Sequence, residues 1–171
     1  MTGRLRYNMF RTRWGYFGIL GHDKALVRTS LPLPDPALAK TYLLVGISSA
    51  EYDAKLLQTL QSDITAYFKG SCVAFSKAPI DLSGLTGFQQ QVLNACRKIP
   101  FGQTASYGQL AGSINNPGAV RAVGTALGKN PLPLIVPCHR IINTGGKLGR
   151  FSAPGGAETK RRLLDLEGVD L

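Results

Sequence analysis

The sequence is poor in cysteine and histidine, and this shortage excludes several kinds of site. Its three cysteines, Cys72, Cys96 and Cys138, form neither a disulfide framework nor a CxxC metal pair. With only two histidines in the chain, we expect no zinc site and no other metal. We also expect no cofactor, and thiols that stay reduced as in an intracellular protein.

Long hydrophobic runs are also missing. No apolar run approaches the roughly 20 residues that a membrane-spanning helix needs. The arginine-rich N-terminus lacks the small-residue cleavage site of a signal peptide. We therefore expect a cytoplasmic protein with no membrane contact. With 171 residues, 44% of them hydrophobic and 18% charged, the chain is long enough to bury a core.

Carboxylates are absent from one long stretch, although the chain as a whole carries a net charge of +10. Between Asp81 and Glu158 there is no aspartate or glutamate. The cations of this stretch are Arg97, Lys98, Arg121, Lys129, Arg140, Lys147 and Arg150. A surface with cations and no anions attracts a polyanion, so nucleic acid is the expected partner. The same absence argues against a metal-dependent nuclease, which holds its ions with carboxylates.

The chain divides into two parts with different patterns, and we expect an α+β fold. Residues 1–79 are predicted to form a strand-rich structural domain, with a small antiparallel sheet and a helix. Its expected elements are two hairpin strands, a further strand and the helix, at residues 16–20, 25–27, 41–47 and 54–68. Residues 74–83 look like the connection. Residues 80–171 are predicted to form a second, mostly helical domain, which contains the stretch without carboxylates and would bind the nucleic acid.

The second part has the outline of a helix-turn-helix. A helix is expected at residues 87–98, and another at 105–114 with Thr104 as its cap. A turn and a helix at 119–128 follow. The exposed positions of this last helix are small, apart from Arg121, which suits minor-groove binding with little sequence readout. The alternative is a packed interface between helices, which leaves Arg121 unexplained.

Residues 135–142 form an apolar run that is interrupted by Cys138, His139 and Arg140. A proline precedes the thiol, a histidine follows it, and Arg140 adds positive charge, so this environment favours the reactive thiolate. The alternative is a core strand whose cysteine merely lies beside a histidine, and these eight residues do not decide between the two. Cys96 lies on the apolar face of a predicted helix, and we expect it to be structural.

A series of motifs resembles the active domain of the O6-alkylguanine-DNA alkyltransferases. In chain order they lie at residues 88–93, 99–111, 117–124, 129–131, 137–140 and 163–168. The match covers about half of the chain, and the order of its motifs makes it specific. Residues 1–79 resemble the more variable N-terminal domain of that family, notably at 10–17 and 66–70. The resemblance implies a winged-helix-like second domain.

The resemblance also implies an irreversible, stoichiometric reaction without a cofactor. Cys138 would attack the alkyl carbon on O6 of guanine, and more weakly on O4 of thymine, after which the protein is spent. His139 would generate the thiolate through a water molecule, with Glu167 orienting the imidazole. Asn130 matches a hinge asparagine that ties the recognition helix to the active-site strand.

The implied partner is double-stranded DNA that carries O6-alkylguanine, bound by a monomer that associates with the nucleoid. The lesion has to be flipped out of the stack. Arg121 would fill the vacated space, and Tyr107 would help to rotate the nucleotide and hydrogen-bond the guanine. Ser152 would donate to O6, and the Ile141 backbone would accept from the base. The positions that match contacts to the DNA backbone are Gln89, Gly108, Asn116 and Thr144.

The sequence departs from the family pattern at several positions. Phe151 stands where several relatives have tyrosine, and Ala153 replaces a glycine seen in some, which leaves the size of the pocket open. The N-terminal zinc ligands of some relatives are missing, so we predict no metal.

Two alternatives belong to other functional classes. A non-catalytic lesion-sensing protein of the same fold would lack the nucleophile, whereas Cys138 is present. A cysteine hydrolase would use a cysteine and a histidine distant in sequence, together with an oxyanion hole. Turnover separates the hydrolase from the transferase, because the transferase gives one product per protein.

Overall fold

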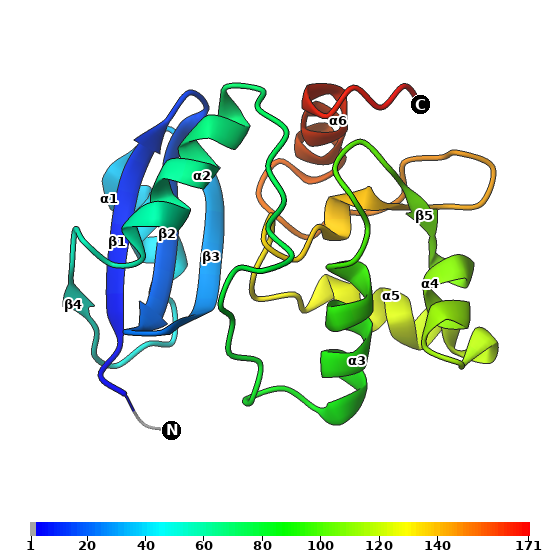
Figure 1. Cartoon of the computed structure of the whole chain (residues 1–171), viewed down its shortest axis with the longest axis horizontal. Coiled ribbons are helices and arrows are strands. Elements are labelled where there is room, and N and C mark those ends of the chain that lie inside the picture. Colours follow the sequence, from blue (N-terminus) through cyan, green and yellow to red (C-terminus); the bar gives the residue numbers. More distant parts are fainter. Residues whose placement is uncertain (1–2) are drawn as a thin grey trace. The chain divides into compact units, whose positions relative to one another are not determined.

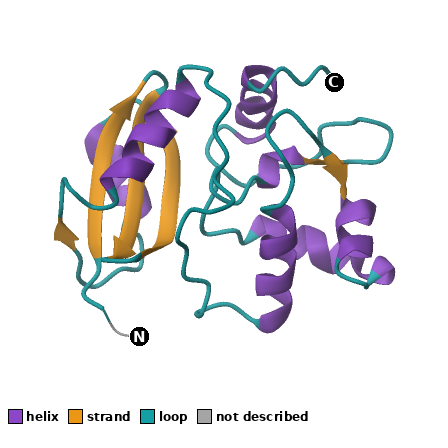
Figure 2. Ribbon diagram, in the orientation of Figure 1, coloured by secondary structure: helices purple, strands orange, loops and turns teal. Residues whose placement is uncertain are grey.

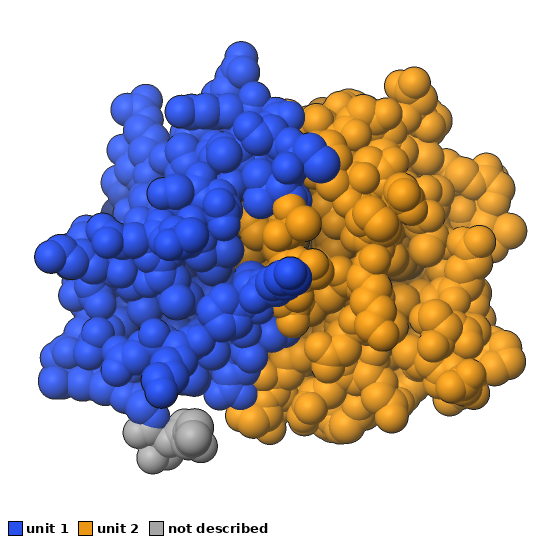
Figure 3. Space-filling model, in the orientation of Figure 1, with its two compact units in different colours: residues 1–73, 77–81 blue, residues 74–76, 82–171 orange. Residues whose placement is uncertain are grey.

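The computed structural model of the chain describes residues 3–171, so residues 1 and 2 of the predicted first domain lie outside the described residues. It forms two compact units, which Figure 3 shows in different colours. Unit 1 is Met1–Val73 with Lys77–Asp81, and unit 2 is Ala74–Ser76 with Leu82–Leu171. Within residues 3–171, no helix has both the length and the apolar character that crossing a membrane requires.

Unit 1 is built on a four-stranded sheet of order β3-β2-β1-β4 (Figure 2). Its strands are β1 (Arg6–Thr12), β2 (Gly15–His22), β3 (Ala25–Leu33) and β4 (Glu51–Tyr52). The first three are antiparallel neighbours, whereas β4 runs parallel to β1. The predicted hairpin is confirmed and its strands are longer than expected. Strand β1 was not anticipated, because both of its faces pack inward, as the burial of the adjacent residues Tyr7 and Asn8 shows, so its sequence lacks a simple apolar–polar alternation.

Two helices cover opposite faces of this sheet (Figure 1). Phe17 contacts Phe68 of α2 (Gln58–Phe68), with ring centroids 6.0 Å apart. The next residue, Gly18, has its Cα within reach of α1 (Pro36–Leu43), since an added Cβ would lie 3.1 Å from a Leu43 methyl group. Successive residues of a strand point to opposite faces, so the two helices sandwich the sheet.

The predicted strand at residues 41–47 is wrong, because the chain forms α1 and a turn there. The side chain of Asp35 accepts hydrogen bonds from the backbone of Ala37 (2.7 Å) and Leu38 (3.1 Å). A proline in the first turn is also compatible with a helix start. Ala39 and Leu43, four residues apart, are both fully buried. The local start signal therefore outweighs the apolar run.

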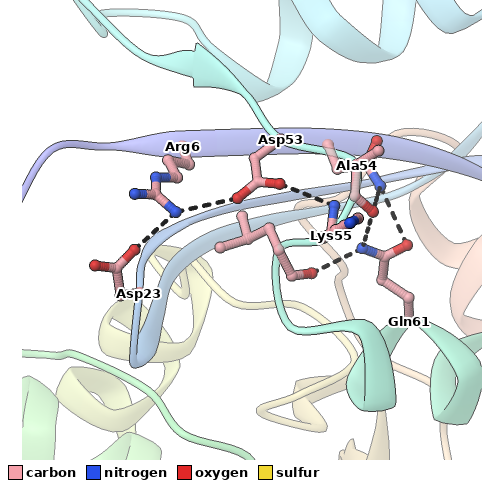
Figure 4. Close-up of polar contacts among 8 residues, drawn as sticks. Arg6, Asp23, Asp53, Ala54, Lys55 and Gln61 are labelled. Atoms are coloured by element: carbon pink, nitrogen blue, oxygen red, sulfur yellow. Dashed lines mark hydrogen bonds and ion pairs between the residues drawn. The ribbon is translucent and has the colours of Figure 1, made fainter.

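A polar network precedes α2 and explains why this helix starts later than predicted (Figure 4). The amide of Gln61 donates to the carbonyls of Ala54 (3.0 Å) and Leu56 (2.7 Å). Arg6 of β1 donates to Asp53 at 3.2 Å. Residues 54–57 are thereby held as a turn, and Leu57 has φ +50° at its end. The helix that was expected from residue 54 is confirmed only from Gln58 onward.

Unit 2 contains four α-helices and a short parallel pair of strands. The helices are α3 (Gly87–Cys96), α4 (Tyr107–Ser113), α5 (Val120–Gly128) and α6 (Gly156–Leu166). Strand β5 (Ala105–Ser106) pairs with β6 (Ile141–Ile142). The predicted cap Thr104 is wrong. Ser106 caps α4 instead, through a reciprocal pair of hydrogen bonds with Gln109 of 2.8 and 3.0 Å, and the residue before it belongs to β5.

The predicted helix-turn-helix is present as α4, the 3₁₀ turn η1 (Pro117–Ala119) and α5. Val123, Ala126 and Leu127 of α5 are buried. Arg121, Ala122 and Thr125 are exposed on the other side. The two alternatives for this helix are therefore both realised, on different faces. One face packs against the rest of the unit, and the other presents small side chains and a single long cation.

The segment between the units belongs partly to each. Arg97, which directly follows α3, donates to the carbonyls of Phe75 (3.2 Å) and Ser76 (2.8 Å), within unit 2. The following residues return to unit 1, where Leu26 donates to the carbonyl of Pro79 at 2.9 Å and accepts from Asp81 at 2.7 Å. Each short piece is thus held by hydrogen bonds to its own unit.

Candidate active site

The nucleophile candidate lies in a buried 3₁₀ turn, η2 (Cys138–Arg140), directly before β6. Pro137 has φ −80° and ψ 61°, which bends the chain out of an extended course. His139 is fully buried, and the side chains of Cys138 and Arg140 are nearly so. The alternative of a core strand is wrong for these three residues, although the segment is buried as that alternative requires.

Glu167 gathers the polar groups of this turn. Its carboxylate lies 2.7 Å from His139 Nε2, and it accepts from Arg140 Nε at 2.9 Å and Nη2 at 3.0 Å. The backbone N–H of Gly102 donates to it at 3.0 Å. Burial raises the pKa of Glu167, but the hydrogen bonds and charges of His139 and Arg140 outweigh it and lower the pKa to about 2. The carboxylate is therefore ionised.

These contacts define the state of the imidazole. An ionised carboxylate only accepts hydrogen bonds, so Nε2 of His139 carries the proton that faces Glu167. Burial lowers the pKa of His139, against the opposing effect of Glu167, and favours the neutral ring. Nδ1 is buried and has no hydrogen-bond partner among the described residues. A neutral imidazole with an oriented ring and an available lone pair is what a general base requires.

The sulfur of Cys138 is held by Asn130. The Asn130 amide donates to Sγ at 3.2 Å and to the carbonyl of Val136 at 3.0 Å. Its oxygen accepts from the backbone of Leu132 at 2.9 Å. Asn130 lies two residues after the end of α5 and contacts the turn that carries the thiol, and its role as a hinge stays a prediction.

Two electrostatic expectations are corrected by the structure. Burial raises the pKa of Cys138, and the Asn130 hydrogen bond and the charge of Lys160 lower it only in part. The resting thiol is therefore protonated, although the local sequence favours a thiolate. Arg140 does not supply the expected charge, because its guanidinium is taken up by Glu167 and by the carbonyl of Ile99 at 2.7 Å. Removal of the thiol proton therefore falls to a base.

Cys138 lines a pocket of about 890 Å³. The expected site residues that line it with Cys138 are Tyr107, Gly108, Arg121, Thr144 and Ser152. Tyr107 is half-buried, and its ring lies against α5, since an added Cβ on Gly124 would meet two ring carbons at 3.9 Å. Burial raises the pKa of Tyr107, and the neighbouring thiols add to the effect, so its phenol keeps the proton. Polar groups from α4, α5 and the 143–152 segment thus converge near one thiol.

Other predicted residues lie away from the pocket lining. The side chain of Gln89 accepts from the backbone of Thr86 at 3.0 Å and closes the N-terminus of α3. Asn116 is exposed in the turn before η1. Ile141 is fully buried, and its carbonyl already accepts from Lys160. The DNA contacts expected of these three positions stay predictions.

Sequence reasoning missed Lys160, a fully buried lysine of α6. The helical spacing could have revealed its burial, because positions three, four and seven residues apart lie on one face of a helix, and Lys160 shares its buried face with Leu163, Leu164 and Glu167. Within residues 3–171 there is also no group of three or more His, Cys, Asp or Glu side chains that could hold a metal ion.

Comparison with known proteins adds independent observations. Residues 87–169 match the family described as "6-O-methylguanine DNA methyltransferase, DNA binding domain". The chain is 50% identical over 104 residues to the methylated-DNA–protein-cysteine methyltransferase of Mycobacterium tuberculosis, an alignment that covers 61% of each chain and so less than two thirds of the relative. It is 34% identical over 140 residues to the protein of that name from Methanothermobacter thermautotrophicus, covering 80% of this chain and 77% of the relative.

The similarity extends to solved structures. A crystal structure of Mycobacterium tuberculosis OGT in complex with DNA matches with a TM-score of 0.79 and 36% identity, and the match covers 95% of this chain and 92% of that chain. Because the match covers 95% of this chain, it includes the sheet-bearing N-terminal part.

Proposed function

The chain belongs to the methylated-DNA–protein-cysteine methyltransferase (O6-alkylguanine-DNA alkyltransferase) family, and from that premise we propose that it repairs alkylated DNA by a single-turnover transfer to Cys138. The substrate is O6-alkylguanine in duplex DNA and, less readily, O4-alkylthymine. The protein acts as a monomer on the cytoplasmic nucleoid, with no metal and no cofactor.

The buried turn supports a simple sequence of bond changes. The proton of the Cys138 thiol passes to Nδ1 of His139, through a water molecule, and the thiolate attacks the alkyl carbon. A sulfur–carbon bond forms while the carbon–O6 bond breaks, and the electron pair of that bond stays on the guanine. Glu167, ionised and 2.7 Å from the imidazole, stabilises the imidazolium that results. Because no step removes the thioether, the protein reacts once.

The pocket supports recognition of an extruded base. Tyr107 and Ser152 carry hydroxyl groups at its lining, where they can donate to the guanine as negative charge develops on it. Arg121 stands exposed on the otherwise smooth face of α5, at the edge of the same pocket. A long planar cation at this point suits the role of filling the space that a flipped nucleotide leaves.

The observation that carries the proposal is the set of contacts around Cys138. Asn130 holds its sulfur, the adjacent imidazole is oriented by a carboxylate, and the thiol opens into a pocket beside a helix-turn-helix. A lesion-sensing protein of this fold needs the pocket and the helices, but it has no use for an oriented base.

The test is mass spectrometry after mixing the protein with a duplex oligonucleotide that contains O6-methylguanine. We expect one added methyl group, on the peptide that carries Cys138, and no further conversion once the protein is used. Cys138→Ser should bind the oligonucleotide without transfer. Methyl label on Cys72 or Cys96, or more than one product per protein, would overturn the proposal, and binding without transfer by the unmodified chain would favour a sensor.

A further inference from the structure

Lys160 is a buried charge that the transfer steps above do not use. It lies in the middle of α6 and has no exposed surface. Burying an ammonium group is unfavourable unless hydrogen bonds and nearby negative charge compensate for the lost water. A helix that needed only to pack would accommodate leucine or methionine here at lower cost. The lysine therefore calls for a role in the site.

The ammonium connects two segments of the pocket. Nζ donates to the carbonyl of Ile141 at 2.5 Å and to that of Arg150 at 3.3 Å. Ile141 follows directly after the turn that carries Cys138, and Arg150 belongs to the segment that leads to Ser152. One side chain thus fixes the strand behind the nucleophile to the segment that would close over the base.

The ammonium group of Lys160 has more N–H donors than the two carbonyls use. An ammonium group has three N–H donors, and two carbonyls account for two of them among the described residues. The titratable groups around it are the thiols of Cys96 on α3 and Cys138 on η2, and the imidazole of His139, whose pKa the charge of Lys160 lowers. Burial lowers the pKa of Lys160 to about 8, and both thiols oppose this effect, so the group stays largely charged at neutral pH.

Neither of the basic side chains of the turn η2 can stabilise the ionised sulfur of Cys138. His139 is neutral, with its pKa lowered by burial, and Arg140 is held by Glu167. Tyr107 also adjoins Cys138 but carries no positive charge. Of the neighbouring side chains, Lys160 is the one whose positive charge lowers the pKa of Cys138.

We propose that Lys160 is a positioning residue of the transfer reaction, whose buried ammonium holds the backbone of Ile141 to that of Arg150 and supplies the positive charge that stabilises the ionised sulfur of Cys138. The inference rests on the proposed function, because it assigns a role in forming the nucleophile of that reaction. It also makes a statement about the thiol alone, which can be measured without DNA.

The experiment follows the alkylation of Cys138 by iodoacetamide between pH 6 and pH 10, by mass spectrometry of the Cys138 peptide. Lys160→Met and Lys160→Gln both remove the charge, and Gln keeps a hydrogen-bond donor for a carbonyl. Lys160→Arg keeps the charge. Arg161→Met is the matched control, since it removes an exposed cation from the next position of α6. Single-turnover methyl transfer from an O6-methylguanine duplex is measured over the same pH range.

Loss of a neighbouring cation raises a thiol pKa by about 1 or more. We therefore expect both neutral variants to alkylate about tenfold more slowly at pH 7.5 and to approach the unmodified protein at high pH. Lys160→Arg should keep the original midpoint while transferring methyl more slowly, because its longer head group cannot reproduce both carbonyl contacts. Arg161→Met should match the unmodified protein in both assays.

A purely structural lysine would give a different pattern, in which all three variants lose rate equally at every pH and the midpoint does not move. That result, or a Lys160→Gln variant with the original midpoint, overturns the inference. If Lys160→Met proves unfolded by circular dichroism, Lys160→Gln decides the question. Failure of the unmodified protein to transfer methyl would overturn the proposed function, while the iodoacetamide profiles would still decide the role of Lys160.

Discussion

Replacing Glu167 by glutamine tests the electrostatic design of the buried turn most directly. The carboxylate accepts from His139, twice from Arg140, and from the backbone of Gly102. A pKa lowered from 4.5 to about 2 corresponds to about 3 kcal/mol of folding free energy. The amide oxygen of glutamine can accept some of these hydrogen bonds, but its N–H group would then face the guanidinium of Arg140. The guanidinium would also lose the negative charge that neutralises it. We expect Glu167→Gln to lose about 3 kcal/mol of stability at pH 7.

The sign of the pH dependence follows from the direction of the pKa shift. A carboxyl group whose pKa is lowered by folding stabilises the protein above its unfolded pKa, and this contribution is lost as the pH falls through the folded value. The difference between Glu167→Gln and the unmodified protein should therefore be constant above about pH 5 and shrink as the pH falls toward about 2. Methyl transfer should also slow, because the imidazolium loses its partner.

Urea unfolding at a series of pH values measures the effect, and Asp165→Asn is the matched control. Asp165 lies two positions earlier on α6 and is exposed, so its replacement should change stability by less than about 0.5 kcal/mol. A loss below about 1 kcal/mol for Glu167→Gln at pH 7, the size of an exposed ion pair, would refute the reasoning. So would a larger loss that does not diminish in acid.

Three further outcomes are expected. Asn130→Ala should raise the pKa of Cys138 in a thiol titration, because it removes a hydrogen bond that lowers this pKa. In urea unfolding the same variant should lose about 1–3 kcal/mol of stability, because the backbone N–H of Leu132 loses its acceptor. Arg121→Ala and Arg121→Lys should slow methyl transfer from duplex DNA far more than they weaken binding, while transfer from the free O6-alkylguanine base stays nearly unchanged; equal losses on both substrates would contradict the proposed filling of the stack. Binding to undamaged duplex should weaken linearly in a plot of log affinity against log salt, and a salt-insensitive affinity would argue against phosphate contacts.

The sequence singled out residues 135–142 as the candidate reactive segment, but it did not identify the partners of their side chains. Cys138 and His139 stand out in an apolar run, and the helices on either side of residues 114–119 follow from their spacing and turn residues. Arg140 was assigned to the thiol because it is two residues away, whereas its carboxylate partner lies 27 positions further along the chain. Distance in sequence says nothing about such a pair until the fold is known.

Lys160 and α1 show two other limits of sequence reasoning. Lysine is almost always exposed, so one lysine on an amphipathic helix is taken for part of its polar face, even where the helical phase places it inside. At residues 41–47 the apolar content suggested a strand, and the decisive feature was the Asp35 cap upstream. In both cases a specific local contact decides the structure against the average composition of the segment. For Lys160 the contact is with two backbone carbonyls, and for α1 it is the cap formed by Asp35.

The connection at residues 74–81 is divided between the two units, and this limits where the chain can be cleaved without loss of contacts. The chain leaves unit 1 after Val73, contributes three residues to unit 2, and returns to unit 1 before it enters unit 2 for good. A cut before residue 82 deprives the guanidinium of Arg97 of two backbone acceptors, and a cut before residue 74 takes from Leu26 the strand-like partner at Pro79–Asp81. No single cleavage therefore yields two whole halves, and a gene fusion or a protease site placed here would weaken one unit or the other.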